Sequence, residues 1–292
     1  MTDFKKKHYR HAVIMTFPAK KLKEYSYCLR GFIENWPPEV FGVALVEGAQ
    51  EIQTLAQKNL KILEFNDCVG EEVKRFEERN LDKDISNLSS VGNITNQAAK
   101  FSRKAYAQIY ALENLDCDYL HYLDADLFTH KKISLPFLDT LIDEEYLLAC
   151  LPRWWQRNEP PENALTNNSL HIGFTETGYI IWNKKHFLFD EWLAKYKECY
   201  DFDKIFEFKA WHDCIAFDYA TLSCLGNSRA QIKDLSNGVL HSHPLVVGPL
   251  GKYFDHMKGP RKFQGFSKEQ ILRHGNLLEK LKYYLKRAHN KN

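Results

Sequence analysis

The sequence has no long hydrophobic run and no regular spacing of its cysteines. No apolar stretch approaches the ~20 residues that a membrane-spanning helix requires. The seven cysteines are scattered, odd in number and without a Cys-x-x-Cys pair, which argues against a disulfide framework and against a zinc site. The N-terminal segment, Met1 to His11, is polar and basic and lacks the apolar core of a signal peptide. We therefore expect a cytoplasmic protein.

A large net charge is also absent, because 40 Lys and Arg oppose 38 Asp and Glu, for a net +2. The charge is nevertheless unevenly placed. Residues 252–292 hold eleven basic and three acidic side chains, a local +8, which leaves −6 (29 minus 35) for the rest. A basic end on an acidic chain favours an anionic partner such as a diphosphate or an anionic lipid surface, so peripheral membrane contact belongs to the prediction. The sequence contains no recognised nucleic-acid-binding module, and we expect no nucleic-acid partner.

The composition suits a large α/β domain. Of the 292 residues, 44% are hydrophobic and 14% are aromatic, which is enough for a sizeable core. Strand-like runs at 11–17, 41–47 and 61–65 alternate with helical spacing, as at 20–36. This alternation is typical of a Rossmann-like half.

The sequence contains no linker that divides it into separate domains. Residues 71–90 fit no single element. We predict one domain over residues 1–265 and a basic C-terminal helix over 266–292, which opens with the capping box Ser267-Lys268-Glu269-Gln270.

Two carboxylates one residue apart follow the most strand-like part of the chain. The run YLHYL at 119–123 leads directly into Asp124 and Asp126. In extended backbone, residues i and i+2 project to the same side, so both acids can aim at one point. Open α/β sheets bind ligands at the carboxyl ends of their strands, and paired carboxylates suit Mg²⁺ or Mn²⁺ together with substrate phosphates. The plain alternative is a strand-end turn with solvated acids.

Asp124-Ala125-Asp126 resembles the DXD motif of glycosyltransferases with the GT-A fold, a mixed Rossmann-like sheet flanked by helices. In that family the metal at this motif holds the diphosphate of a nucleotide-sugar donor, most commonly a UDP-sugar. The resemblance implies a hexosyl- or pentosyltransferase that uses Mn²⁺ or Mg²⁺ and has a glycan, glycolipid or glycoprotein acceptor. The Asp-x-Asp-x-Thr pattern of phosphatase-like haloacid dehalogenases fits less well, because Phe128 stands in place of the threonine.

Two further segments resemble donor-binding parts of the same family. The helix predicted before the aspartate pair carries Arg103 and Lys104, and the resemblance implies that either side chain reaches a phosphate or the donor sugar. The segment Glu176-Thr177-Gly178 resembles the glycine-containing loop beside the donor sugar. This places Gly178 at the donor and Glu176 near the reacting centre. Solvated basic side chains and a surface glutamate at a turn are the structural alternatives.

Asp213 precedes a helical run at the place where many GT-A enzymes carry the acid of an xED motif, although His212 replaces the glutamate here. In inverting members this acid removes the proton from the acceptor hydroxyl. The resemblance therefore implies Asp213 as the first candidate base and Glu176 as the second. Its structural alternative is a helix-capping acid.

A late histidine completes the resemblance. His256 is similar to the C-terminal His of the glycogenin-like group, which supplies a third metal ligand, and Lys258 or Lys262 would then contact the diphosphate. The spacing departs from that pattern, so His241 or His243 is an alternative ligand.

Two other functions remain open. A sugar-1-phosphate nucleotidyltransferase normally has a glycine-rich loop after its first strand, whereas Thr16-Phe17-Pro18-Ala19-Lys20 contains no glycine. If the protein is a glycosyltransferase, Thr16 is a candidate donor contact.

A non-catalytic carbohydrate-binding protein on the same scaffold is the second alternative. Trp154 or Trp155, in a loop rich in Pro and Asn, could stack on an acceptor sugar or anchor the loop.

Overall fold

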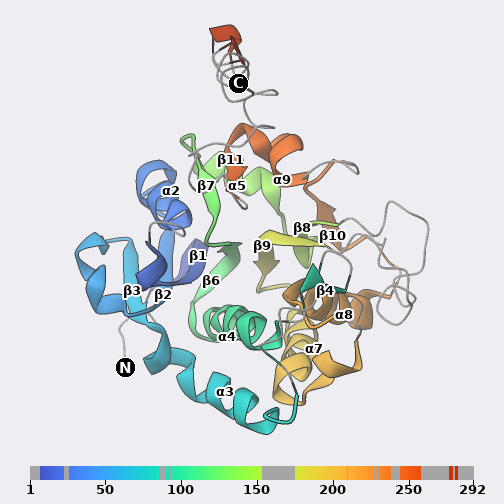
Figure 1. The fold of residues 1–292 in the computed structure, drawn as a ribbon. Coiled ribbons are helices and arrows are strands. Elements are labelled where there is room, and N and C mark those ends of the chain that lie inside the picture. Colours follow the sequence, from blue (N-terminus) through green and yellow to red (C-terminus); the bar gives the residue numbers. More distant parts are fainter. Residues whose placement is uncertain are drawn as a thin grey trace, which may run out of the picture.

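A mixed β-sheet runs through the protein and helices cover both of its faces (Figure 1). The structure is a computed structural model, and the residues that it describes are 7–22, 26–83, 85, 90–91, 94–95, 97–152, 175–208, 210–226, 228, 230–237, 244–257, 276–278 and 280–281. Among these residues no helix is long and apolar enough to cross a bilayer. The boundary predicted between 265 and 266 lies outside them and stays a prediction.

Seven strands of the described residues form the main sheet, in the order β10-β8-β9-β6-β1-β2-β3. Their bounds are β1 Tyr9–Pro18, β2 Phe41–Glu47, β3 Leu60–Glu64, β6 Cys117–Leu123, β8 Leu148–Leu151, β9 Glu176–Asn183 and β10 Ile232–Asp234. β1 pairs in parallel with β2 and β6, whereas β9 runs antiparallel to both of its neighbours, β6 and β8. The predicted α/β class, a mixed sheet flanked by helices, is confirmed.

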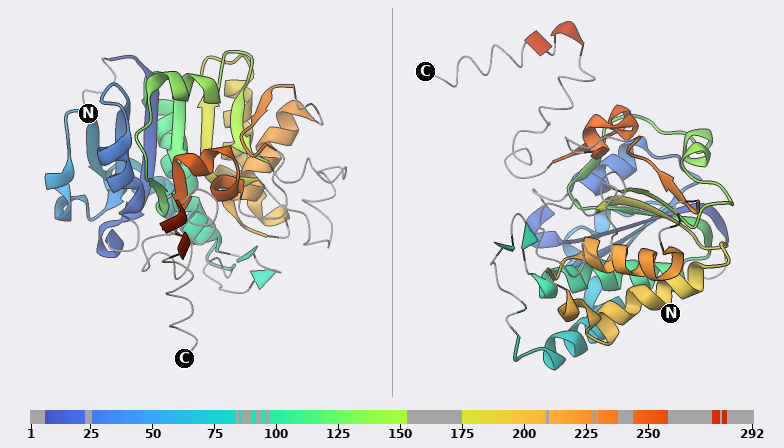
Figure 2. Two further views of the ribbon diagram at one scale, coloured as in Figure 1. Left: turned by 90° about the horizontal axis from the view of Figure 1, so that it is seen from above. Right: turned by 90° about the vertical axis from the view of Figure 1, so that its right-hand side faces the viewer.

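The helices divide into two layers (Figure 2). One layer consists of α3 (Phe65–Arg79), α4 (Ala98–Asn114), α7 (Phe189–Asp201) and α8 (Asp213–Leu225). The opposite layer contains α2 (Tyr27–Asn35), α5 (Leu135–Leu141) and α9 (Pro244–Val247). Short 3-10 turns occupy Ala19–Lys21, Ala49–Glu51, Gln53–Leu55, Lys204–Glu207 and Pro249–Lys252.

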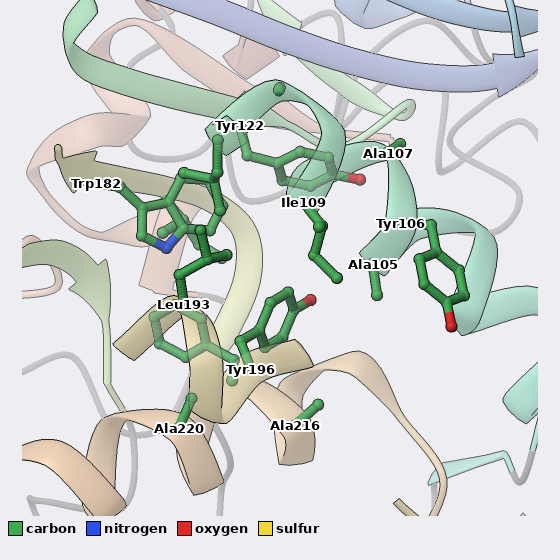
Figure 3. Packing of buried hydrophobic residues seen from close by; sticks show 14 of the residues in the cluster. Ala105, Tyr106, Ala107, Ile109, Tyr122, Trp182, Leu193, Tyr196, Ala216 and Ala220 are labelled. Carbon is green, nitrogen blue, oxygen red and sulfur yellow. The ribbon is translucent and has the colours of Figure 1, made fainter. Parts of the chain in front are cut away.

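Each layer closes its own hydrophobic core against the sheet. Figure 3 shows part of the first core, in which Tyr122 of β6 and Trp182 of β9 meet Ile109 of α4 and the side chains of Leu193 and Tyr196 of α7. Burying one large apolar side chain in this way stabilises the fold by about 1.5–3 kcal/mol. The sheet that carries the candidate site is therefore held rigidly from both sides.

Helix α3 is the main element that the sequence pattern left unassigned. Its apolar face begins with Phe65 and Val69 and continues with Val73 and Phe76, all of them buried. Strand β3 ends at Glu64, whose side chain accepts a hydrogen bond from the backbone N–H of Asn66 at the start of the helix. Phe65 fits the end of the strand as well as the first turn of the helix, so the sequence pattern does not show where the helix begins.

Two small antiparallel pairs accompany the main sheet. One joins β4 (Ser90–Val91) to β5 (Ile94–Thr95), and the other joins β7 (Leu127–Thr129) to β11 (Phe254–His256). The second pair begins just beyond β6 and brings the late part of the chain back to the aspartate motif (Figure 1).

Candidate functional site

Asp124, Asp126 and His256 meet at the carboxyl end of β6. One ligand atom from each side chain lies within 4.8 Å of the others, and His256 Nε2 is 2.8 Å from Asp126 Oδ1. The histidine is fully buried, while both aspartates are partly exposed. Two carboxylates and one imidazole at this spacing form a donor set that suits a divalent cation such as Mn²⁺.

The β7–β11 pair explains how residues 130 positions apart come together. The ladder places His256 opposite Leu127, the residue after Asp126. It is extended by the backbone N–H of Met257, which donates to the carbonyl of Asp126 at 2.9 Å. His256 is therefore positioned by backbone hydrogen bonds, which bring its side chain to that of Asp126.

Gly178 lets β9 approach this cluster closely. The antiparallel strand starts at the edge where β6 ends, and the Asp124 N–H donates to the Gly178 carbonyl at 2.9 Å. A Cβ atom on Gly178 would lie 3.2 Å from His256 Cε1 and 3.1 Å from Glu176 Oε1. A larger residue would be tightly packed here, so Glu176 or His256 would have to move by a few tenths of an ångström. The backbone conformation does not demand glycine, because Gly178 is outside the left-handed region.

Lys104 of α4 supplies a partly buried positive charge beside the aspartates. Its Nζ lies 2.6 Å from Asp213 Oδ2, 3.6 Å from Asp124 Oδ2 and 4.8 Å from the ring centroid of Tyr122. Burial by itself would lower the pKa of Lys104, but the carboxylates of Asp124 and Asp213 more than offset this and raise it above its ordinary value. Lys104 is therefore charged throughout the physiological pH range.

Asp213 is the first residue of α8, as the helical run predicted, and is only 1% exposed. Its Oδ2 accepts a hydrogen bond from Thr177 Oγ1 at 2.7 Å, and its Oδ1 lies 2.7 Å from His212 Nδ1. Burial would raise the pKa of Asp213, yet Lys104 and His212 hold it well below its ordinary value. A carboxylate that is stabilised in this way is a weak base.

Arg103 points away from the aspartate pair. Its guanidinium contacts Glu47 Oε1 at 2.7 Å and Glu77 Oε1 at 3.2 Å, so two acids already balance its charge. The sequence left Arg103 and Lys104 as equal candidates. The structure brings Lys104, and not Arg103, into contact with Asp124 and Asp213.

A cavity of about 460 Å³ opens onto the cluster. Its lining comes from β1, β2, the starts of α3, α8 and β9, α4, the 3-10 turn after β1 and the end of β6 with the residues that follow it. Among the lining residues are Thr16, Lys21, Glu47, Phe65, Phe101, Arg103, Lys104, Asp124, Asp126, Glu176, Thr177 and Asp213. One wall is acidic, whereas Lys21, Lys100, Arg103 and Lys104 contribute cations. The cavity can therefore accept an anionic molecule next to a bound cation.

Two contributors were missed at the sequence level. Thr177 bonds to Asp213, and the Tyr122 hydroxyl donates to Asp124 Oδ1 at 3.1 Å. Burial and the nearby carboxylate of Asp124 raise the pKa of Tyr122 well above its ordinary value, so the phenol keeps its proton. The sequence could have predicted the role of Tyr122, because in a strand the residue two positions before Asp124 projects to the same side as Asp124.

Several predicted residues lie outside the described part of the chain. They are the candidate phosphate contacts Lys258 and Lys262, the alternative ligands His241 and His243, and the loop tryptophans Trp154 and Trp155.

Several solved glycosyltransferase structures are similar to this one. WbbM, a bifunctional glycosyltransferase, shares 13% identity at a TM-score of 0.47, over 78% of this chain and 39% of that one. Mouse xyloside xylosyltransferase 1 shares 11% sequence identity at a TM-score of 0.45, and the match covers 77% of this chain and 85% of that one. The galactosyltransferase LgtC, in complex with donor and acceptor sugar analogues, shares 13% sequence identity at a TM-score of 0.42. This match covers 77% of this chain and 73% of that one.

No protein-family model and no curated protein matches the sequence. Structural likenesses at these TM-scores are too weak to assign an activity, so the assignment depends on the geometry of the site. The architecture itself, a mixed sheet flanked by helices with Asp-Ala-Asp at the carboxyl end of its central strand, is the one that the resemblance to GT-A glycosyltransferases predicted.

Proposed function

We propose that this protein is a metal-dependent glycosyltransferase. It would transfer a hexosyl or pentosyl group from a nucleotide-diphosphate sugar, with UDP-sugars as the first candidates, to a hydroxyl of a glycan, lipid or protein. The observation that carries the proposal is the convergence of Asp124, Asp126 and His256 beside a cavity that the two aspartates line together with the partly buried cation of Lys104. A lipid acceptor would suit the basic end of the chain, which could contact an anionic membrane surface.

Asp124, Asp126 and His256 would hold the metal, with Mn²⁺ or Mg²⁺ as the candidates. When bound, such a cation supplies positive charge that stabilises the leaving nucleoside diphosphate. The protein's own contribution is to keep the three ligands within 4.8 Å of one another and to place the Tyr122 hydroxyl on Asp124, which orients that carboxylate.

Lys104 would provide a second, permanent positive charge toward the donor. Its ammonium group is fixed by Asp213 and stays protonated, so it can stabilise an anionic donor in the cavity without gaining or losing a proton. Gly178 and Thr16 would line the donor, and Lys258 or Lys262 would add phosphate contacts. Arg103, which also lines the cavity and is paired with Glu47, would be a further donor contact.

Glu176 is the better candidate for the general base. A base must have a proton affinity suited to removing a hydroxyl proton, and the pKa of Asp213 is held too low for that task. Glu176 is half-buried, lines the cavity and lies over Gly178 next to His256. We therefore assign proton removal to Glu176 and assign to Asp213 the fixing of Lys104 and Thr177.

Calorimetric titration with UDP in the presence and absence of Mn²⁺ tests the metal site. We expect Mn²⁺ to tighten UDP binding in the wild-type protein and to have no such effect in Asp124→Asn. Asp190→Asn, an exposed position on α7, is the matched control and should retain the metal effect. Equal UDP affinity with and without Mn²⁺ in the wild-type protein would remove the metal from the proposal.

UDP release from a panel of UDP-hexoses and UDP-pentoses then separates an enzyme from a carbohydrate-binding protein. Turnover of one donor supports the transferase, whereas binding without turnover of any donor supports the non-catalytic alternative.

A further inference from the structure

Glu176 is flanked by two threonines, and each is hydrogen-bonded to a different carboxylate of α8. Thr177 Oγ1 donates to Asp213 Oδ2 at 2.7 Å. Thr175 donates twice to Asp218, from Oγ1 to Oδ1 at 2.5 Å and from its backbone N–H to Oδ2 at 3.1 Å. All four side-chain positions are at most 5% exposed. In such an environment these hydrogen bonds are shielded from competing water.

The two elements match in length at the contact. Five residues of helix between Asp213 and Asp218 rise ~7.5 Å along the helix axis, and two residues of extended chain between Thr175 and Thr177 span ~6.7 Å. The axial distances are similar, and although residues five apart point about 140° apart around a helix, both aspartate side chains reach the same stretch of chain. Together they attach the start of β9 to α8 at two separate points.

The direction of Glu176 follows from this attachment. Successive side chains of a strand point to opposite sides, so Thr177 faces α8 while Glu176 and Gly178 face the other way. That other side is occupied by His256, whose Cε1 would be 3.2 Å from a Cβ on Gly178, with Glu176 Oε1 at 3.1 Å from the same point. The threonine contacts thus turn the Glu176 carboxylate toward the metal cluster.

We propose that Thr175 and Asp218 are positioning residues for Glu176, an inference that rests on the base assigned in the proposed function. Neither side chain lines the cavity, so neither is available to contact the donor. Strand pairing holds the backbone from Glu176 onward, through Leu151 of β8 and the Asp124 N–H on the Gly178 carbonyl, but it does not include the residue before Glu176. The second attachment, at Thr175, holds this residue and keeps the carboxylate in reach of the acceptor hydroxyl.

Thr175→Val tests this role because valine keeps the side-chain volume and the backbone N–H but removes the hydroxyl donor. We expect kcat for UDP release to fall by about 10- to 100-fold, because a displacement of about 1 Å at a reacting group has effects of this size. KM for the donor and the Mn²⁺-dependent affinity for UDP should stay within twofold of the wild-type values. Thr175→Ser, which keeps the hydroxyl, should restore kcat.

Thr221→Val is the matched control for a purely structural effect. Thr221 is equally buried on α8, donates to the Phe217 carbonyl and accepts from Trp192 Nε1. We expect it to lower the melting temperature without lowering kcat. Hydrogen exchange of the amides at 176–178 gives a readout that does not depend on activity, and it should accelerate in Thr175→Val but not in Thr221→Val.

The outcomes distinguish the two proposals. With an active wild-type enzyme, unchanged kcat or unchanged exchange in Thr175→Val would refute the positioning role and leave the transferase assignment standing. A parallel loss of kcat and UDP affinity, or an equal loss of kcat in Thr221→Val, would also refute it. A wild-type protein that turns over no donor in the panel would overturn both proposals.

Discussion

Replacing Gly178 with alanine should disturb the candidate metal cluster through packing alone. The added Cβ would lie 3.1 Å from Glu176 Oε1 and 3.2 Å from His256 Cε1, closer than ordinary van der Waals contact. His256 cannot withdraw easily, because it is fully buried and its Nε2 lies 2.8 Å from Asp126 Oδ1. The imidazole must therefore shift by a few tenths of an ångström, and the ligand geometry must change with it.

The expected size of this effect has two parts. Overpacking of a rigid site destabilises a protein by about 1–3 kcal/mol, which urea unfolding would measure as a lower midpoint. Disturbing the support of a metal ligand weakens metal affinity by about 10- to 100-fold, which calorimetric titration with Mn²⁺ would measure. Backbone strain adds nothing, since the backbone of Gly178 is not in the left-handed region.

Gly70→Ala provides the control for the Gly178→Ala experiment. Gly70 lies within α3, where the three atoms nearest to an added Cβ all belong to the exposed side chain of Asn66, the closest at 3.3 Å, so the strain falls on the surface and away from the cluster. Alanine in a helix interior is favoured over glycine by about 1 kcal/mol, which offsets this strain. We expect unchanged or slightly higher stability and unchanged Mn²⁺ affinity for Gly70→Ala. Wild-type stability together with wild-type Mn²⁺ affinity in Gly178→Ala would refute the close packing of Gly178 against His256.

Two further predictions concern buried ionisable groups. Glu176→Gln should lower kcat by about 10²- to 10⁴-fold with UDP affinity retained, as expected for a lost general base. Asp213→Asn should lower the free energy of unfolding by about 1–3 kcal/mol, because it removes the nearer of the two carboxylates beside the partly buried Lys104. The opposite pattern in steady-state kinetics and urea unfolding would exchange the two roles. The second prediction is loss of stability in mild acid. Burial lowers the pKa of His121 well below 6.5, and burial also lowers that of His11, while both side chains titrate near 6.5 in the unfolded chain. Below that pH the unfolded state binds more protons, so the free energy of unfolding should fall by up to about 1.4 kcal/mol per pH unit for His121 and by less for His11, whose pKa the Asp139 carboxylate raises against the effect of burial. Urea unfolding between pH 7 and pH 5 should show this slope, and a slope that is unchanged in His121→Gln would contradict it.

The fold was predictable where one local pattern dominated. The aromatic and apolar run before Asp124 predicted a strand, and the structure has β6 there. Helix α3 was not predictable in the same way, because its first buried residue, Phe65, directly follows the strand β3 and fits either element. Local pattern does not decide such a boundary, since the choice depends on which face of the sheet is still open for packing.

The candidate site was predictable as a set of residue types but not as a set of roles. Arg103 and Lys104 are neighbours on one helix, and only the packing of α4 decides that Lys104 meets Asp213 while Arg103 meets Glu47. In the same way, the sequence marked Asp213 as the first candidate base, and only the tertiary structure places it in contact with Lys104 and Thr177, which is the ground on which we propose Glu176 instead. Roles of this kind depend on the distances between charged groups from different elements.

By itself, the sequence determined the alternation of strands and helices and the Asp-Ala-Asp pair at a strand end, because both follow from the periodicity of neighbouring residues. Tertiary structure alone decided that His256 joins this pair, since the β7–β11 ladder closes a loop of about 130 residues through backbone hydrogen bonds that no local pattern encodes. It also decided the direction of Glu176, because the antiparallel β9 and its threonine contacts with α8 bring together segments that are far apart in the chain.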